Sequence, residues 1–139
     1  MPRVVIDPNV LISALINPGG PPAELVQAWR DGFYEMVVCP ELVAEVRDVV
    51  RRPKIAERID DVAAAEFLAA LPVAARNLPD PPARPGATRD PEDDYLIALA
   101  IEDDADLIVS GDAAVLDEGV EGPLRLSPRA ALQWLHERP

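Results

Sequence analysis

The stretch Val4-Val5-Ile6-Asp7-Pro8-Asn9 decides the fold class of this 139-residue chain. Three consecutive β-branched apolar residues are typical of a short strand buried on both faces, as in parallel sheets. Pro8 and Asn9 end this strand, and the apolar residues of the segment Val10–Ile16 recur at helical spacing. Asp7 therefore stands at the carboxyl end of a buried strand, the edge where ligands bind in open α/β sheets.

Strands and helices alternate along the rest of the chain. Further strands are predicted over Tyr34–Cys39, Leu107–Val109 and Leu124–Leu126, with an edge strand over Val73–Leu78. Helices are predicted over Val10–Ile16, Pro22–Asp31, Glu41–Arg52, Asp60–Leu71 and Tyr95–Ile101, and after Ser127-Pro128. This alternation predicts an α/β fold, a three-layer α/β/α sandwich with a central parallel sheet of four to five strands.

Length and composition indicate a single domain over residues 1–139. A chain of this size buries a core without disulfides, and its one cysteine, Cys39, is expected to be a small buried residue. The segment Pro79–Pro91 holds five prolines and is typical of an extended crossover loop within one domain. Since no stretch resembles an export signal or a membrane span, we expect a cytoplasmic protein that makes no use of a membrane.

The charge balance narrows the class of function. A net charge of −12, from 25 acidic and 13 basic residues, argues against passive nucleic-acid binding, because that affinity comes from cations that release phosphate counterions. A metal-dependent enzyme is compatible with it, since Mg²⁺ binds carboxylates and brings positive charge to a phosphate. The chain has no P-loop, and its one histidine, His136, has no nucleophile signature beside it.

Four acidic residues from four segments are expected to meet at one edge of the sheet. Asp7 and Asp112 each follow a buried strand. Glu45 lies beside the apolar stripe of its helix, about 100° from the centre of that stripe, so it leans toward a groove. Asp94 shares a helix face with apolar residues three, four and seven positions further on, which turns its carboxylate toward the sheet.

Most of these acids also have a plain structural explanation, although the inward face of Asp94 makes one harder to give for that residue. Asp7 and Asp112 can be turn residues and Glu45 a solvated helix acid. Asp90 and Asp93 suit an N-cap and first helical turn, and Asp103, Asp104 and Asp106 suit a solvated helix end. Taken jointly, four acids on the expected edges favour a site for Mg²⁺ or Mn²⁺, because carboxylates this close need a cation among them. Such an ion can promote phosphodiester hydrolysis, and Arg89 is a candidate for binding a substrate phosphate.

The motifs that surround these acids resemble the PIN-domain family, of the kind found as toxins of bacterial toxin–antitoxin systems. Four motifs occur in the family's order over essentially the whole chain: Val5-Ile6-Asp7-Pro8-Asn9-Val10, Pro40-Glu41-Leu42 with Glu45, Asp90-Pro91-Glu92-Asp93-Asp94 followed by Tyr95-Leu96-Ile97-Ala98, and Leu107-Ile108-Val109-Ser110-Gly111-Asp112. Each motif alone is a weak signal. Four in order are fairly specific.

The resemblance implies a Mg²⁺- or Mn²⁺-dependent ribonuclease that cleaves single-stranded RNA. It further implies a homodimer and a cognate antitoxin protein as partner. Carried over to this chain, the catalytic and metal-binding acids are Asp7, Glu45, Asp94 and Asp112, with Asp93 as a further metal ligand. Asn9 and Ser110 match positions that support the acids by hydrogen bonds.

Pro8 departs from the family pattern, which has threonine at this position. Proline has neither a hydroxyl nor a backbone N–H, so one contact that supports the metal site is expected to be missing. Two alternatives therefore stay open. One is a PIN scaffold that binds a partner protein or RNA and hydrolyses poorly. The other is an Asp-nucleophile phosphotransferase, although Asn9 and the lack of a lysine after the late strands fit that class badly.

Overall fold

A parallel sheet of five strands forms the centre of the molecule in a computed structural model that describes residues 1–82, 94–112 and 123–138. Its strands lie in the order β3-β2-β1-β4-β5. Their bounds are β1 Arg3–Ile6, β2 Glu35–Val38, β3 Arg76–Asn77, β4 Leu107–Val109 and β5 Leu124–Leu126. The predicted fold class is confirmed, and β1 is the middle strand, paired with β2 on one side and β4 on the other.

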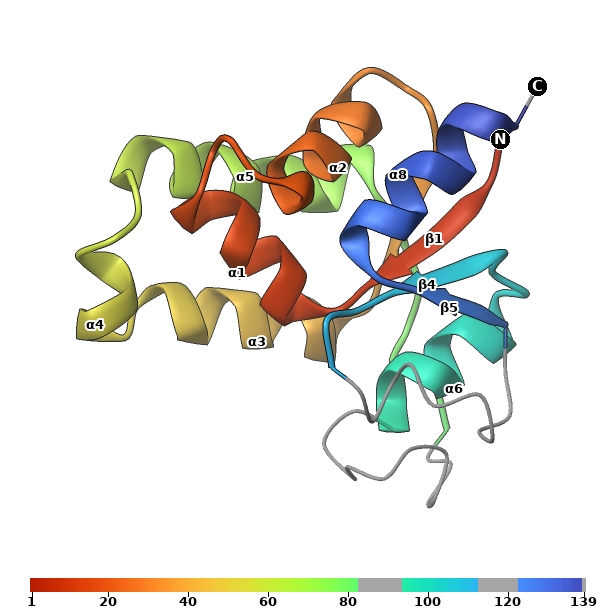
Figure 1. The fold of residues 1–139 in the computed structure, drawn as a ribbon. Coiled ribbons are helices and arrows are strands. Elements are labelled where there is room, and N and C mark those ends of the chain that lie inside the picture. The colour runs from red at the N-terminus through yellow and green to blue at the C-terminus, as the bar shows by residue number, and fades with distance from the viewer. Residues whose placement is uncertain (83–93, 113–122, 139) are drawn as a thin grey trace.

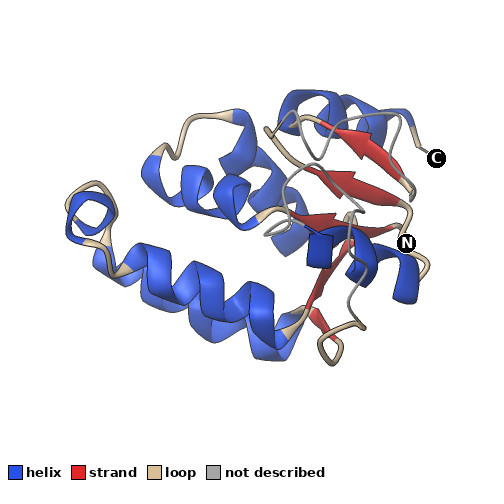
Figure 2. Ribbon diagram, turned by 90° about the horizontal axis from the view of Figure 1, so that it is seen from below, coloured by secondary structure: helices blue, strands red, loops and turns tan. Residues whose placement is uncertain are grey.

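Helices cover both faces of this sheet and extend beyond it. They are α1 Pro8–Ile16, α2 Pro21–Arg30, α3 Pro40–Val50, α4 Pro53–Ala56, α5 Asp61–Ala74, α6 Asp94–Glu102 and α8 Pro128–Glu137. Helix α6 packs on β1 and β4, while α1 packs on α2 and α3 and α2 packs on α8. Figure 1 shows α6 below the sheet, α8 and α2 above it, and α1 to its left. Figure 2 shows α6 in front of the strands when the molecule is seen from below. No helix of the described residues is long and apolar enough to cross a membrane.

The core consists of the β-branched and leucine side chains that the two sheet faces and their helices share. Val5, Ile6, Val37 and Ile108 are fully buried, as expected for central parallel strands. Cys39 is also buried, which confirms the prediction for this residue, and Trp29 is buried as well. Trp134 is partly buried on the core, and the guanidinium carbon of Arg138 lies 4.2 Å from its ring centroid.

Prolines move two helix starts one or two residues ahead of the predicted positions. Pro8 and Pro21 each occupy the first turn of a helix, ahead of the predicted starts at Val10 and Pro22. Pro40 begins α3, as its place after the second strand predicts. The first helical N–H groups have no partner within a helix, so proline loses nothing there and its fixed φ suits the helix. The start of the Asp90 helix and most of the segment Pro79–Pro91 lie outside the described residues.

The predicted edge strand Val73–Leu78 is wrong in its bounds. Helix α5 continues through Pro72 to Ala74, Val73 is 87% exposed, and the strand β3 contains only Arg76 and Asn77. The Asn77 side-chain amide donates hydrogen bonds to the carbonyls of Leu71 and Ala75, so it caps the end of the helix. The apolar content of this stretch belongs to the last helical turn, which sequence periodicity did not distinguish from a strand.

The acids at the end of α6 do not form a wholly solvated helix end, which corrects a second prediction. Asp103 is buried and accepts two hydrogen bonds at 2.9 Å from the Arg76 guanidinium. Its Oδ1 also lies 3.7 Å from the Arg3 guanidinium nitrogen Nη1. Asp106 is exposed, but it accepts the backbone N–H of Arg3 at 2.8 Å. Asp104 alone fits the solvated interpretation. This cluster therefore ties β1 and the edge strand β3 to the end of α6.

Replacing Asp103 by asparagine is expected to destabilise the edge of the sheet. The amide keeps the shape of the carboxylate but loses its charge, so the hydrogen bonds from Arg76 weaken. We expect a loss of about 1–2 kcal/mol in the free energy of unfolding, because the arginine can still be solvated. Urea denaturation of wild type and Asp103→Asn measures this, with Asp104→Asn as the exposed control. Equal stability of the three proteins would contradict the structural role of Asp103.

Candidate active site

Asp7 is a buried carboxylate held by hydrogen bonds to both of its oxygens. It follows β1 directly and is the N-cap of α1, with 1% of the residue exposed. The backbone N–H of Asn9 donates to its Oδ1 at 2.9 Å, and the Ser110 hydroxyl donates to its Oδ2 at 2.8 Å. Pro8 occupies the first helical position, where a backbone N–H is not needed by the helix. The helix start and its neighbour strand therefore fix the position of this carboxylate.

Ser110 joins Asp7 to Asp112. Ile6 of β1 pairs with Val109 of β4, so the residues that follow these two strands lie side by side. The buried Ser110 hydroxyl donates to Asp7 and also accepts the backbone N–H of Asp112 at 2.9 Å. Sequence comparison with the family proposed Ser110 as a support for the acids, and the structure gives it that contact. Asp7 and Asp112 thus lie together at the carboxyl edge of the central strands.

The Asp7 carboxyl has a raised pKa. Burial raises the pKa of Asp7 above its ordinary value, the hydrogen bonds from Asn9 and Ser110 oppose that shift, and the charge of Asp112 adds to it. A buried carboxylate beside a second acid is costly to ionise without a cation. The electrostatics of this pair therefore suit a bound positive charge.

Glu45 and Tyr95 form a second group at this edge. Glu45 lies on α3, whose N-terminal end is capped by the Asp80 carboxylate through the backbone N–H of Glu41 at 2.8 Å. The Tyr95 hydroxyl donates to Glu45 Oε1 at 3.1 Å. Burial raises the pKa of Tyr95 well above its usual range, and the charge of Glu45 and, more weakly, that of Asp7 add to the shift. The hydroxyl is therefore a stable donor, and it lies near both acids.

Asp94 was predicted as a metal ligand and Asn9 as a hydrogen-bonding support for the acids, and the structure describes both residues. Asp94 is 9% exposed at the start of α6, the helix that packs on β1 and β4. Asn9 is exposed, and the contact it makes with Asp7 is through its backbone N–H. Asp93 and Arg89, predicted as a metal ligand and a phosphate-binding residue, lie outside the described residues. Tyr95 was not identified as a site residue from the sequence, although its place next to Asp94 was available as a signal.

The described acids do not form a ready-made metal cage. Among residues 1–82, 94–112 and 123–138, no group of three or more Asp, Glu, His or Cys side chains is arranged to hold a metal ion. The donor type is nevertheless the one that Mg²⁺ and Mn²⁺ prefer, namely carboxylate oxygen. Asp7 and Asp112 are two described acids of this kind that one residue, Ser110, joins by hydrogen bonds.

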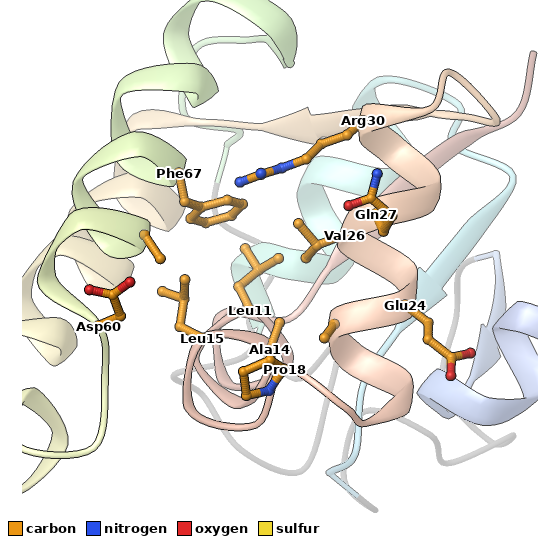
Figure 3. A pocket seen from close by; sticks show the side chains of 12 residues that line it. Leu11, Ala14, Leu15, Pro18, Glu24, Val26, Gln27, Arg30, Asp60 and Phe67 are labelled. Atoms are coloured by element: carbon orange, nitrogen blue, oxygen red, sulfur yellow. The ribbon is translucent and has the colours of Figure 1, made fainter.

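Two hollows adjoin or flank this region. One of about 310 Å³ is lined by Asp112, Asn9, Ser13, Pro22, Gly111 and other residues of the α1 and α8 starts. The other, of about 470 Å³, lies between α1, α2 and α5 and is mainly apolar, with Leu11, Leu15, Val26 and Phe67 in its wall (Figure 3). None of the four predicted catalytic acids lines the second hollow. Hydrolytic chemistry is therefore expected at the first hollow and not at the second.

Comparison with known proteins agrees with this fold and this motif order. A crystal structure of PAE2754 from Pyrobaculum aerophilum superposes with a TM-score of 0.66, at 15% sequence identity, over 99% of this chain and 91% of that chain. No curated protein sequence matches the chain. The sequence profile of the PIN domain matches residues 3–114, a range that includes Asp7, Glu45, Asp94 and Asp112. The chain belongs to the PIN domain family.

Proposed function

We propose that this PIN domain is a Mg²⁺- or Mn²⁺-dependent endoribonuclease that cleaves phosphodiester bonds of single-stranded RNA. The PIN domain is a nuclease-type fold. The observation that carries the proposal is the Asp7–Ser110–Asp112 group, in which one buried serine joins two acids at the carboxyl edge of β1 and β4. The proposal includes the dependence on Mg²⁺ or Mn²⁺, the choice of RNA as substrate and the preference for single-stranded RNA, and each is open to experiment.

The residues proposed to hold the metal are Asp7, Glu45, Asp94 and Asp112, with Asp93 as a further ligand. When bound, such an ion polarises a phosphoryl oxygen and lowers the pKa of a bound water. The chain itself supplies rigid placement. Asp7 is held at both oxygens before any ligand arrives, so little reorganisation is needed at the moment of reaction.

Binding of RNA has to overcome the repulsion between its phosphates and a protein of net charge −12. A divalent ion held by the acids would offset part of their negative charge and would give a phosphate oxygen a cation to bind, and Arg89 is proposed to bind a phosphate. The hollow of about 310 Å³ beside Asp112 has walls from Asn9, Pro22 and Pro128. This hollow is the proposed binding site of a nucleotide next to the scissile bond, because polar and proline side chains line it and it lies beside Asp112.

Metal dependence is the direct test of this function. Cleavage of an end-labelled single-stranded RNA is expected with Mg²⁺ or Mn²⁺, and a chelator should lower the rate by at least about 100-fold. Glu45→Gln should show the same loss in the presence of metal. Asp48→Asn is the matched control, since Asp48 is an exposed acid of the same helix. Cleavage that continues unchanged in the chelator, or equal loss in both variants, would contradict the proposal.

A binding module without strong catalysis is the second candidate function. It is favoured by Pro8 in the first motif and by the net charge of −12. Calorimetric titration with Mn²⁺ separates the two candidates. No binding at millimolar metal supports the inactive scaffold, whereas binding that Asp7→Asn weakens supports the nuclease.

The proposed partners are a cognate antitoxin protein and a second copy of the chain. The apolar hollow between α1, α2 and α5 supports a protein partner, because exposed apolar concave surface is typical of sites that another chain covers. Light scattering of the protein alone tests the homodimer, and co-purification with the product of the neighbouring reading frame tests the antitoxin. A mass of 15.0 kDa in light scattering would exclude the homodimer. The absence of a co-purifying protein would exclude the antitoxin partner.

A further inference from the structure

The hydrogen bond from Tyr95 to Glu45 connects helix α6 to helix α3, and these two helices pack on different elements. Tyr95 is the second described residue of α6, which packs on β1 and β4. Glu45 lies on α3, which packs on α1 and α5. The Tyr95 hydroxyl reaches Glu45 Oε1 at 3.1 Å across the carboxyl edge of the sheet. The Tyr95 hydroxyl therefore links the two helices that carry Asp94 and Glu45.

Glu45 has the longest side chain of the four predicted catalytic acids, so a hydrogen bond that fixes its carboxylate matters for the site. Asp7 is held by Asn9 and Ser110, and the backbone N–H of Asp112 is held by Ser110. Glutamate has a longer side chain with more rotamers to choose from, so its carboxylate is harder to keep in one place. A phenol donor on one carboxylate oxygen selects among those rotamers. A charged acceptor makes this hydrogen bond stronger than one between neutral groups.

We propose that Tyr95 is a positioning residue whose hydroxyl holds the Glu45 carboxylate in the orientation that the acidic site requires. Tyr95 acts through Glu45 and is not assigned any contact with substrate. The proposal rests on the proposed nuclease function for its kinetic consequence. Its consequence for metal binding can be measured without RNA.

Tyr95→Phe is the direct test, because it removes the hydroxyl and keeps the ring. We expect kcat for RNA cleavage to fall about 10–100-fold, as is common when a group that orients a ligand is lost, with little change in KM. The Kd for Mn²⁺, measured by calorimetry without RNA, should rise over the same range. Circular dichroism and a cooperative melting curve check that the variant is folded.

Tyr34→Phe is the matched control. Tyr34 is the chain's other tyrosine, and its buried hydroxyl donates to the backbone carbonyl of Leu25 at 2.7 Å, away from the acids. This variant should melt at a lower temperature and keep the wild-type kcat and Mn²⁺ affinity. If both variants lose activity in proportion to their loss of stability, Tyr95 has only a structural role and the inference is overturned.

A double-mutant cycle with Glu45→Ala separates positioning through Glu45 from an independent effect. If Tyr95 acts through Glu45, adding Tyr95→Phe to Glu45→Ala should change kcat and Mn²⁺ affinity less than twofold, whereas additive losses overturn the inference. Wild-type cleavage and metal binding in Tyr95→Phe also overturn it and leave the nuclease function standing. Conversely, a wild type that binds Mn²⁺ and cleaves no RNA, with weaker Mn²⁺ binding in Tyr95→Phe, supports positioning and rejects the nuclease.

Discussion

Asp7→Asn is expected to abolish RNA cleavage and to raise the melting temperature of the metal-free protein at neutral pH. The loss of activity should be at least about 100-fold, the size seen when a charged group that stabilises a transition state is removed. The asparagine keeps the shape of the side chain and can still accept the N–H of Asn9 through its carbonyl oxygen. The fold is therefore retained while the negative charge is lost.

The gain in stability follows from the direction of the pKa shift. Burial raises the pKa of Asp7 in the folded protein above its value in the unfolded chain. The folded state thus holds a proton more tightly than the unfolded state does, and this contribution to stability is complete below the unfolded pKa and is lost as pH rises through the folded pKa. As the pH rises, the wild type has to ionise a buried carboxylate, and the neutral amide avoids that cost.

Melting curves of wild type and Asp7→Asn between pH 4 and pH 8, without metal, measure this effect. The advantage of the variant should grow as pH rises and shrink toward the acidic end. Excess Mn²⁺ should stabilise the wild type more than the variant, because only the wild type offers the full carboxylate site. A variant that cleaves RNA at the wild-type rate would remove Asp7 from the site, whatever its stability.

Ser110→Ala is expected to lower both activity and stability. The serine hydroxyl is fully buried, and its removal leaves Asp7 Oδ2 without its donor and the N–H of Asp112 without its acceptor. Leaving buried polar groups unpaired costs about 1–3 kcal/mol in the free energy of unfolding. Because the two acids also lose the link that aligns them, kcat should fall about 10–100-fold.

Ser127→Ala serves as a control for the loss of stability. Ser127 is the N-cap of α8 and accepts the N–H of Ala130 at 3.3 Å, and losing such a cap typically costs about 1 kcal/mol. This variant should be destabilised and remain fully active at a temperature where it is folded. If Ser110 aligns the two acids, the activity of Ser110→Ala should stay low even when every molecule is folded, unlike that of Ser127→Ala. Full activity of folded Ser110→Ala would reject the aligning role.

Several features could be read from the sequence because local chemistry determines them. The runs Val4–Ile6 and Leu107–Val109 are apolar and rich in β-branched residues, which is typical of central parallel strands. Helical spacing identified the helices, and the order of the motifs identified the family. The placement of Asp7 and Asp112 at a shared edge followed from the parallel arrangement alone, since the carboxyl ends of neighbouring parallel strands meet.

Other features depended on partners that are distant along the chain. The bonds of Asp103 to Arg76, of Tyr95 to Glu45 and of Glu41 to Asp80 join residues 27, 50 and 39 positions apart. No local pattern marks such pairs, because a carboxylate on a helix end looks the same whether water or an arginine meets it. The predicted strand Val73–Leu78 was misjudged for a related reason: its first residues, Val73, Ala74 and Ala75, are apolar like the rest of α5, and only packing decided where the helix ended.

The sequence by itself determined that Asp7 follows a buried strand, that other acids follow comparable elements, and that these acids share one edge of a parallel sheet. Only the tertiary structure decided how each acid is held: Asp7 by Ser110 and Asn9, and Glu45 by Tyr95. The reason is physical. The period of a strand or helix sets which way a side chain points, whereas its hydrogen-bond partner is set by which elements pack together.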